Sequence, residues 1–312
     1  MSEHAFTFPL DIERLIIEYA AREDNRTALR LALVSRCAQS WSVENCVHSS
    51  IAHSSFPNSF SKILRVEPII YRFVDLHSVR AKKSFLESLE VSTKPRSFYN
   101  RCIKILFVPF DHTPAREWDD GIETVIKLLP YCQGVEYLFW WICPDRKDAR
   151  LVDLLSNMRP KRLDADFINL LGSTQSDFSL PFFDNITHLV VSEAPPNWTA
   201  IQALPCLSHL LIDWIHKYVM PNDSDLLKVA ADVLSHCKTL KVCAIRYPAG
   251  RGPNLDATLH ELQDDRLVFI IAQIGWMLDL LSYARGKPDA WVHAEAAVAK
   301  QKQGGRVEPF LC

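Results

Sequence analysis

The chain has 312 residues, with 35 Lys and Arg against 37 Asp and Glu and a formal net charge of −2. Because this balance gives no positive field that would hold a polyanion, it argues against a general nucleic-acid-binding protein. The length predicts one small unit and one large unit, and a hydrophobic content of 48% is typical of a globular chain with a sizeable core.

Membrane and targeting signals are the next features to consider. No basic segment followed by an apolar run stands at the N-terminus, so we expect no signal peptide. The stretch from Leu267 to Leu281 is too short and too polar to span a bilayer. Nine cysteines without a C-x-x-C pair are typical of buried thiols in a reducing compartment. The chain is therefore expected in the cytoplasm or nucleus, away from membranes.

Residues 8–41 are predicted to form a compact helical unit. Pro9 suits a helix start, and the apolar residues after it, Ile12, Leu15 and Ile16, recur at helical spacing on one face. Thr27 is a suitable N-cap for a second helix. That second helix is apolar on most sides, so we expect neighbours or a partner to cover it.

Residues 42–65 interrupt this pattern. Seven of these 24 residues are Ser, and neither a helical nor a strand period is present. Patterned sequence resumes at 66–71, so the segment is predicted to be a disordered loop inserted in a domain that spans residues 1–75. A genuine loop and an intron retained in the gene model are both compatible with the sequence. Residues 76–100 are expected to be a connector.

Residues 101–272 show a repeated apolar-x-x-apolar-x-apolar pattern. Counted between the middle residues, the spacings are 32, 25, 26, 21 and 33 residues, and helical stretches precede most of the segments. Strand-plus-helix units at this period indicate an irregular leucine-rich-repeat-like solenoid. The six segments are Ile103/Leu106/Val108, Val135/Leu138/Trp140, Pro160/Leu163/Ala165, Ile186/Leu189/Val191, Leu207/Leu210/Ile212 and Leu240/Cys243/Ile245.

One feature speaks against the repeat. The position that usually holds Asn or Cys in such repeats has Cys143 in one unit only. An ordinary α/β domain would also alternate short strands with helices.

A further strand is expected at Leu267 to Ile271. A last helix is expected after Pro288, so that residues 273–302 would cap the end of the array. Residues 303–312 are expected to be a disordered tail.

The sequence contains no familiar catalytic, cofactor-binding or metal-binding motif, and we expect no enzyme activity. There is no glycine-rich phosphate loop and no nucleophile elbow. His236, Cys237 and Cys243 come closest to a zinc cluster, although a structural role is favoured. Asp164 and Asp166 would share one strand face, where they could bind a cation. A solvated strand face is the favoured interpretation.

Two further pairs stand out on the predicted strands. His188 and His209 occupy equivalent positions of successive units and are expected to stack on an exposed surface, without forming a catalytic dyad unless a carboxylate orients them. Trp140 and Trp141 should point to opposite faces, so that one is internal. The other would be either a binding anchor or part of the packing.

The N-terminal segment resembles an F-box-like domain of the kind found in fungal proteins with degenerate leucine-rich repeats. The resemblance rests on the order of a Pro-containing start, a first helix, a Leu-x-x-Val-Ser-Arg run, a Trp and a later Pro and Tyr. Residues 42–65 interrupt this order. The residues concerned are Phe8-Pro9-Leu10-Asp11-Ile12, Leu15-Ile16, 28–36, Trp41, Pro68 and Tyr71. Segments 185–189 and 204–210 resemble the repeat region of the same family.

The resemblance implies an α+β or α/β repeat fold headed by a helical module. It implies that the helices bind the Skp-type adaptor of a cullin-based SCF-type ubiquitin ligase, and that the array binds a protein substrate of unknown identity. The adaptor-binding residues would be Phe8, Pro9, Leu10, Ile12, Leu15, Ile16, Leu31 and Val34. Two alternatives remain: a repeat scaffold with a non-functional F-box, and an unrecognised α/β enzyme.

Overall fold

The fold is known from a computed structural model. It describes residue 19 and residues 71–109, 118–141, 149–165, 178–191, 201, 203–213, 223–248, 262, 264–272, 276–305 and 309–311. Of the predicted F-box-like domain these include only Tyr19, which is helical and exposed, and residues 71–75. The eight expected adaptor-binding residues and the predicted loop at 42–65 therefore lie outside the described residues.

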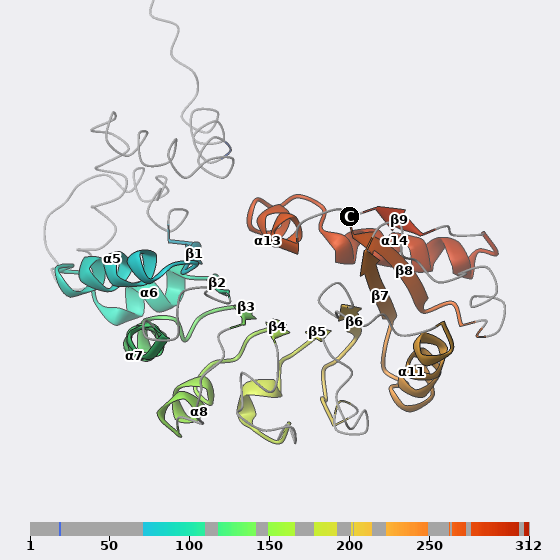
Figure 1. Ribbon diagram of the computed structural model, residues 1–312, viewed down its shortest axis with the longest axis horizontal. Coiled ribbons are helices and arrows are strands. Elements are labelled where there is room, and N and C mark those ends of the chain that lie inside the picture. The colour runs from blue at the N-terminus through green and yellow to red at the C-terminus, as the bar shows by residue number, and fades with distance from the viewer. Residues whose placement is uncertain are drawn as a thin grey trace, which may run out of the picture.

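The described residues form an α/β fold built on one parallel sheet. Its nine strands lie in the order in which they occur in the chain, from β1 to β9, and each is parallel to the next. Figure 1 shows them following one another in an arc. The strands are β1 Phe73–Asp75, β2 Ile105–Val108, β3 Tyr137–Trp140, β4 Arg162–Ala165, β5 His188–Val191, β6 His209–Asp213, β7 Val242–Pro248, β8 Leu267–Ala272 and β9 Phe310–Leu311.

The six predicted strand segments are confirmed, and their middle residues are in register. Leu138 pairs with Leu163, Leu163 with Leu189, and Leu189 with Leu210. The same row continues to Leu106 on one side and to Cys243 and Leu267 on the other. All of these residues are buried in one hydrophobic core. The ladder exists because strands in register place equivalent side chains about 4.8 Å apart on one face.

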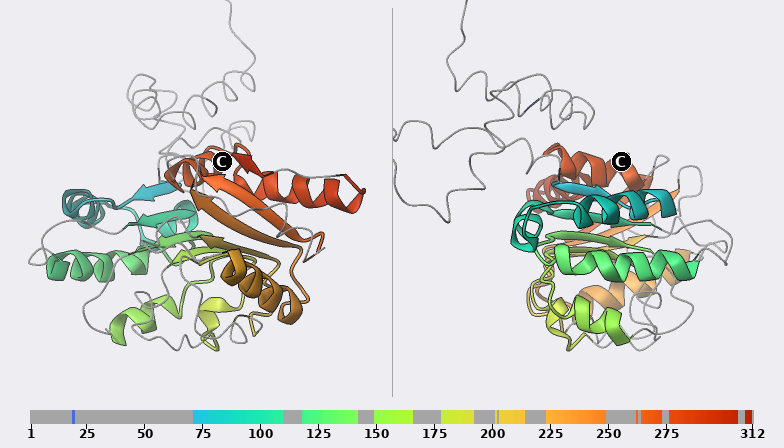
Figure 2. Two further views of the ribbon diagram at one scale, coloured as in Figure 1. Left: turned by 45° about the vertical axis from the view of Figure 1, so that its right-hand side comes forward. Right: turned by 90° about the vertical axis from the view of Figure 1, so that its left-hand side faces the viewer.

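Helices cover this first face of the sheet on the outer side of the arc (Figures 1 and 2). The crossovers that connect β1 through β7 supply apolar residues to this core, such as Leu128 and Leu155. The predicted helices near 122–129, 151–158 and 226–234 are confirmed within a few residues. The elements are α5 Val79–Glu90, α6 Arg96–Cys102, α7 Trp118–Leu128, η2 Leu129–Tyr131, α8 Ala149–Leu155, η3 Pro181–Phe183 and α11 Asp223–His236.

The C-terminal helices lie elsewhere than expected. α13 (Trp276–Ala284) and α14 (Ala290–Lys302) cover the second face of the sheet, inside the arc, instead of closing its end (Figure 2). Leu280 of α13 packs on Phe107 and Phe139, whereas Trp291 and Ala294 of α14 pack on strands β5 to β8. The strands are apolar on both faces, so they require cover on both.

A compact turn fixes the position of α14. α13 ends in a Schellman motif, in which the N–H of Gly286 donates to the Tyr283 carbonyl at 3.0 Å and that of Lys287 donates to Ser282 at 2.8 Å. Gly286 has a φ of 69°, a conformation that favours glycine. Asp289 then caps α14 by accepting the N–H of Val292 at 3.1 Å.

Three expected boundaries differ from the structure. Residues 73–75, assigned above to the helical domain, form the first strand of the sheet. The expected connector at 76–100 contains α5 and most of α6, whose residues Leu89 and Phe98 belong to the first-face core. In the expected tail, Phe310–Leu311 forms β9 against β8. The strands β1 and β9 escape sequence patterns because two or three residues show no period.

Candidate functional site

Polar side chains form a row across the second face of the sheet. Tyr137, Arg162, His188 and His209 occupy paired positions on the consecutive strands β3 to β6. Because neighbouring parallel strands place equivalent residues side by side, this row brings together chemistry from four separate units. None of these side chains faces the leucine ladder.

His188 and His209 stack, as the sequence predicts. Their ring centroids are 4.1 Å apart, with 7° between the ring planes. The expectation that they lie on an exposed surface is wrong, because α14 covers them and leaves His209 only 4% exposed. Trp291 of α14 contacts both rings edge-on, with centroids 5.1 Å from His188 and 5.7 Å from His209.

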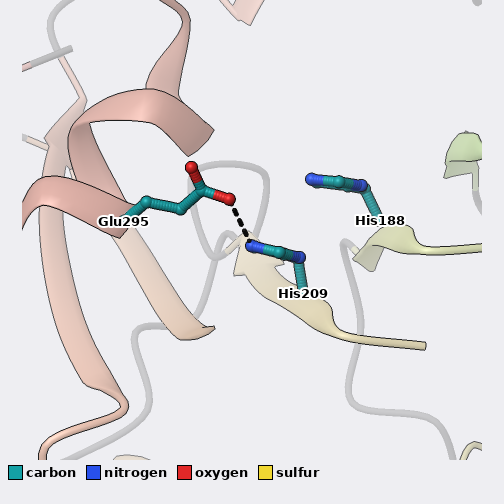
Figure 3. A group of neighbouring side chains, drawn as sticks. All are labelled: His188, His209 and Glu295. Carbon is teal, nitrogen blue, oxygen red and sulfur yellow. Dashed lines mark hydrogen bonds and ion pairs between the residues drawn. The ribbon is translucent and has the colours of Figure 1, made fainter. Parts of the chain in front are cut away.

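A carboxylate from α14 completes this group. His209 Nε2 lies 2.9 Å from Glu295 Oε1, and Figure 3 shows the Glu295 side chain extending from the helix towards the ring of His209. The carboxylate therefore orients one ring of the stacked pair, that of His209. One candidate ligand atom from each of His188, His209 and Glu295 lies within 4.8 Å of the others.

Both imidazoles are neutral at neutral pH. Burial lowers the pKa of His188 to about 2, and the neighbouring His209 and Arg162 act in the same direction. Burial also lowers the pKa of His209, although the Glu295 carboxylate opposes the shift. Neutral imidazole is the form that accepts hydrogen bonds and binds metal ions.

A buried ionic cluster lies next to the histidines on the same face. Arg246 of β7 forms ion pairs with Asp213 of β6 and, at 3.0 Å, with Asp279 of α13. Asp279 also accepts the backbone N–H of Ala290, so it links α13 to α14. Burial raises the pKa of Asp279, whereas the positive charge of Arg246 opposes that shift.

Asp164 sits in this cluster without an ion pair of its own among the described contacts. Its Oδ1 accepts the indole N–H of Trp141 at 3.0 Å. Burial raises the pKa of this carboxyl to about 7, although Arg246 opposes the shift. The expectation of a solvated carboxylate is therefore wrong for Asp164, while Asp166 lies outside the described residues.

The cluster surrounds a cavity too small for an organic substrate. Its volume is about 20 Å³, and it is lined by Asp164, Arg246, Asp279 and Trp291 among others. Such a volume holds about one water molecule. Arg162 borders the same region, where it pairs with Asp289 and lies over the Tyr283 ring at 4.2 Å. These contacts attach the C-terminal helices to the sheet.

The remaining sequence candidates do not form a metal cluster among the described residues. Cys237 and Cys243 lie in the first-face core, whereas His236 is exposed and pairs with Asp232. Burial raises the pKa of the Cys243 thiol to about 12, as expected of an inert thiol. Trp140 and Trp141 do point to opposite faces, but Trp141 packs against Phe139 and is not a free anchor.

Sequence reasoning did not identify Glu295, Arg162, Arg246 or Asp213 as members of one site. A usable signal existed, since polar residues at Arg162, Asp213 and Arg246 interrupt strands that are otherwise strongly apolar. Buried polar residues are placed only where a partner satisfies them. Glu295 gave no such signal because it belongs to a helix with many exposed polar residues.

Comparisons with protein-family models, with curated proteins and with solved structures find no match to this chain. Among the described helices, none is long and apolar enough to cross a membrane.

Proposed function

We propose that the protein is a non-catalytic substrate-recognition subunit of a cullin-based SCF-type ubiquitin ligase. The N-terminal helices would bind the Skp-type adaptor, and the parallel-sheet array, as a leucine-rich-repeat-like solenoid, would bind the protein substrate. The observation that carries the proposal is the strand order, in which each strand–helix unit pairs only with its chain neighbours. An array of this kind offers one extended surface, and extended surfaces suit macromolecular partners.

The first-face helices add a surface of suitable chemistry. A groove of about 560 Å³ runs between α5, α6, α7 and α8, and its lining combines aliphatic residues with arginines and a tyrosine. Arg and Tyr are enriched at protein interfaces because they combine apolar area with hydrogen bonding. The lining includes Leu86, Arg96, Ile126, Tyr131, Arg150 and Leu154.

The adaptor-binding half of the proposal rests on the sequence from Phe8 to Val34. Leu15 and Ile16 share the apolar face of the predicted first helix, where an amphipathic helix would enter a partner groove. By raising the local concentration of substrate beside a ubiquitin-loaded enzyme, such a subunit accelerates transfer without chemistry of its own.

Co-precipitation of the full chain with a purified Skp-type adaptor tests the proposal. The double variant Leu15→Asp, Ile16→Asp should abolish binding, because charge buried in an apolar contact costs several kcal/mol. A matched control places Asp at two exposed apolar positions of the array, Val91 and Val292, which are 82% and 47% exposed. This control should bind normally.

Two results would contradict the proposal. Adaptor binding that survives the Leu15/Ile16 double change would show that the first helix is not the docking element. A wild-type chain that binds no adaptor would favour the alternative of a scaffold with a non-functional F-box. If binding is confirmed, proximity labelling from the full chain would identify the substrate.

A further inference from the structure

We propose that His188, His209 and Glu295 form a binding site for a divalent transition-metal ion, with zinc as the expected ion. Two imidazole nitrogens and one carboxylate are zinc's ordinary protein ligands, and a water molecule would complete a tetrahedral set. The three ligand atoms lie within 4.8 Å of one another and come from β5, β6 and α14 (Figure 3). The bound ion would clamp the last long helix onto the sheet.

Hydroxyl groups hold both imidazoles in the orientation that such a site needs. Thr187 Oγ1 lies 2.8 Å from His188 Nδ1 and 3.0 Å from the Lys161 carbonyl. Because the hydroxyl proton is donated to that carbonyl, Oγ1 accepts the Nδ1 proton, and His188 Nε2 keeps its lone pair. Histidines that bind metals characteristically donate their second N–H in this way.

The same arrangement is repeated one strand further on. Ser208 Oγ lies 2.8 Å from His209 Nδ1 and 3.2 Å from the Thr187 carbonyl. In the metal-free state His209 Nε2 donates to Glu295, and the Ser208 hydroxyl donates to Nδ1. When a metal displaces the Nε2 proton, the hydroxyl turns to the carbonyl and accepts from Nδ1–H instead. Both tautomers are therefore supported without backbone movement.

Metal binding requires a modest side-chain adjustment. Zinc lies about 2.0–2.1 Å from each nitrogen, so its ligand atoms are closer together than 4.8 Å. The stacked rings also direct their lone pairs in parallel, and each must rotate slightly towards the shared ion. Glu295 is 55% exposed on its side chain and has the freedom to follow. The backbone on both sides is fixed by the strand pairing and by the Asp289 cap.

The charges that face the site allow a cation to bind. Glu295 contributes one negative charge, and the nearby positive charge of Arg162 is paired with Asp289. Lys241 is the other cation that acts on His209.

Isothermal titration of the full, chelator-treated chain with zinc chloride tests the proposal. We expect the wild type to bind zinc, and His188→Asn, His209→Asn and Glu295→Gln each to weaken the affinity at least tenfold. Glu295→Gln is the decisive variant, since its amide oxygen still accepts the His209 hydrogen bond and the position is half exposed. Its fold should therefore be unchanged in a thermal melt without metal.

Controls and a spectroscopic measurement make the test specific. His293→Asn changes an exposed histidine on the same helix, and His236→Asn changes an exposed histidine paired with Asp232; both should leave zinc affinity unchanged. Co²⁺ bound by the wild type should show the strong visible absorption of a tetrahedral site, and Glu295→Gln should reduce it. Zinc affinity that is equal in the wild type and in all three ligand variants, or a wild type that binds no zinc, would overturn the proposal.

Discussion

Arg246 and Asp213 form an ion pair inside the sheet, with only 5% and 1% of their side chains exposed. They stand on neighbouring strands at directly paired positions, since Asp213 of β6 is in register with Arg246 of β7. Removing the Arg246 charge would take this ion pair away from the buried Asp213, and Asp279 would lose its ion pair with the same guanidinium. One guanidinium thus compensates carboxylates from two layers of the fold.

Replacing Arg246 by Met should destabilise the protein by about 3–5 kcal/mol, because two carboxylates lose their ion pair with this guanidinium, and one of them is fully buried. The free energy of unfolding in urea measures this loss. The double variant Arg246→Met, Asp213→Leu should recover part of it, since both charges are then absent. Arg150→Met, at the exposed pair with Glu123, is the control and should cost less than about 1 kcal/mol. Equal losses at the two sites would refute the buried-pair argument.

Asp164 should make the protein less stable as pH rises. Its native pKa is about 7, against 3.8 for a free carboxyl, so between these values the folded state holds a proton that the unfolded state has released. Stability therefore falls from about pH 4 to pH 7 and then levels off. Asp164→Asn should remove this component, of the order of 2 kcal/mol between pH 5 and pH 8.

The measurement compares urea unfolding of the wild type and the variant at those two pH values. Asn keeps an oxygen that accepts the Trp141 indole N–H, so the comparison isolates the charge. Asp232→Asn, at a half-exposed pair, should leave the wild-type pH dependence in place. Parallel pH profiles for wild type and Asp164→Asn would show that Asp164 does not titrate in this range.

His188 should act in the opposite direction. Its pKa is about 2 in the native protein and 6.5 for a free imidazole, so below pH 6.5 the unfolded state takes up a proton that the folded state refuses. Stability is therefore full above about pH 6.5 and is lost as the pH falls. Relative to His188→Asn, the wild type should lose up to about 1.4 kcal/mol between pH 7.5 and pH 5.5. Urea unfolding with a chelator present measures the difference, and His236→Asn should behave as the wild type does.

The sequence predicted the sheet well because the relevant information is local. The spacing of Leu138, Leu163, Leu189 and Leu210 defines which side chains share a face, and strand register follows from burying that face. Alternation also placed Trp140 and Trp141 on opposite faces correctly. Such patterns identify residues that point the same way, but they do not say what covers them.

The candidate site could not be predicted for that reason. His188 and His209 were placed as neighbours, yet their cover comes from a helix whose Glu295 lies 86 residues beyond His209. The contact between Arg162 and Asp289 spans 127 residues. Contacts of this length depend on how α13 and α14 return across the sheet, and no periodicity within either helix encodes that path. For the same reason the strand pattern predicts a solvated face for Asp164, which is in fact buried.

The leucine ladder provides the last prediction, which concerns the whole array. Leu163 and Leu189 are paired across β4 and β5, and both are buried. Each Leu→Ala change should cost about 2–5 kcal/mol, since it removes buried methyl groups and leaves a cavity. The free-energy loss of the double variant should differ from the sum of the two single losses, because the side chains share neighbours and the two cavities merge or relax together. Val91→Ala, at an exposed position, is the control and should stay within about 0.5 kcal/mol. Urea unfolding of the wild type and the four variants decides the matter: single changes that cost no more than the control would mean that these leucines do not hold neighbouring units together.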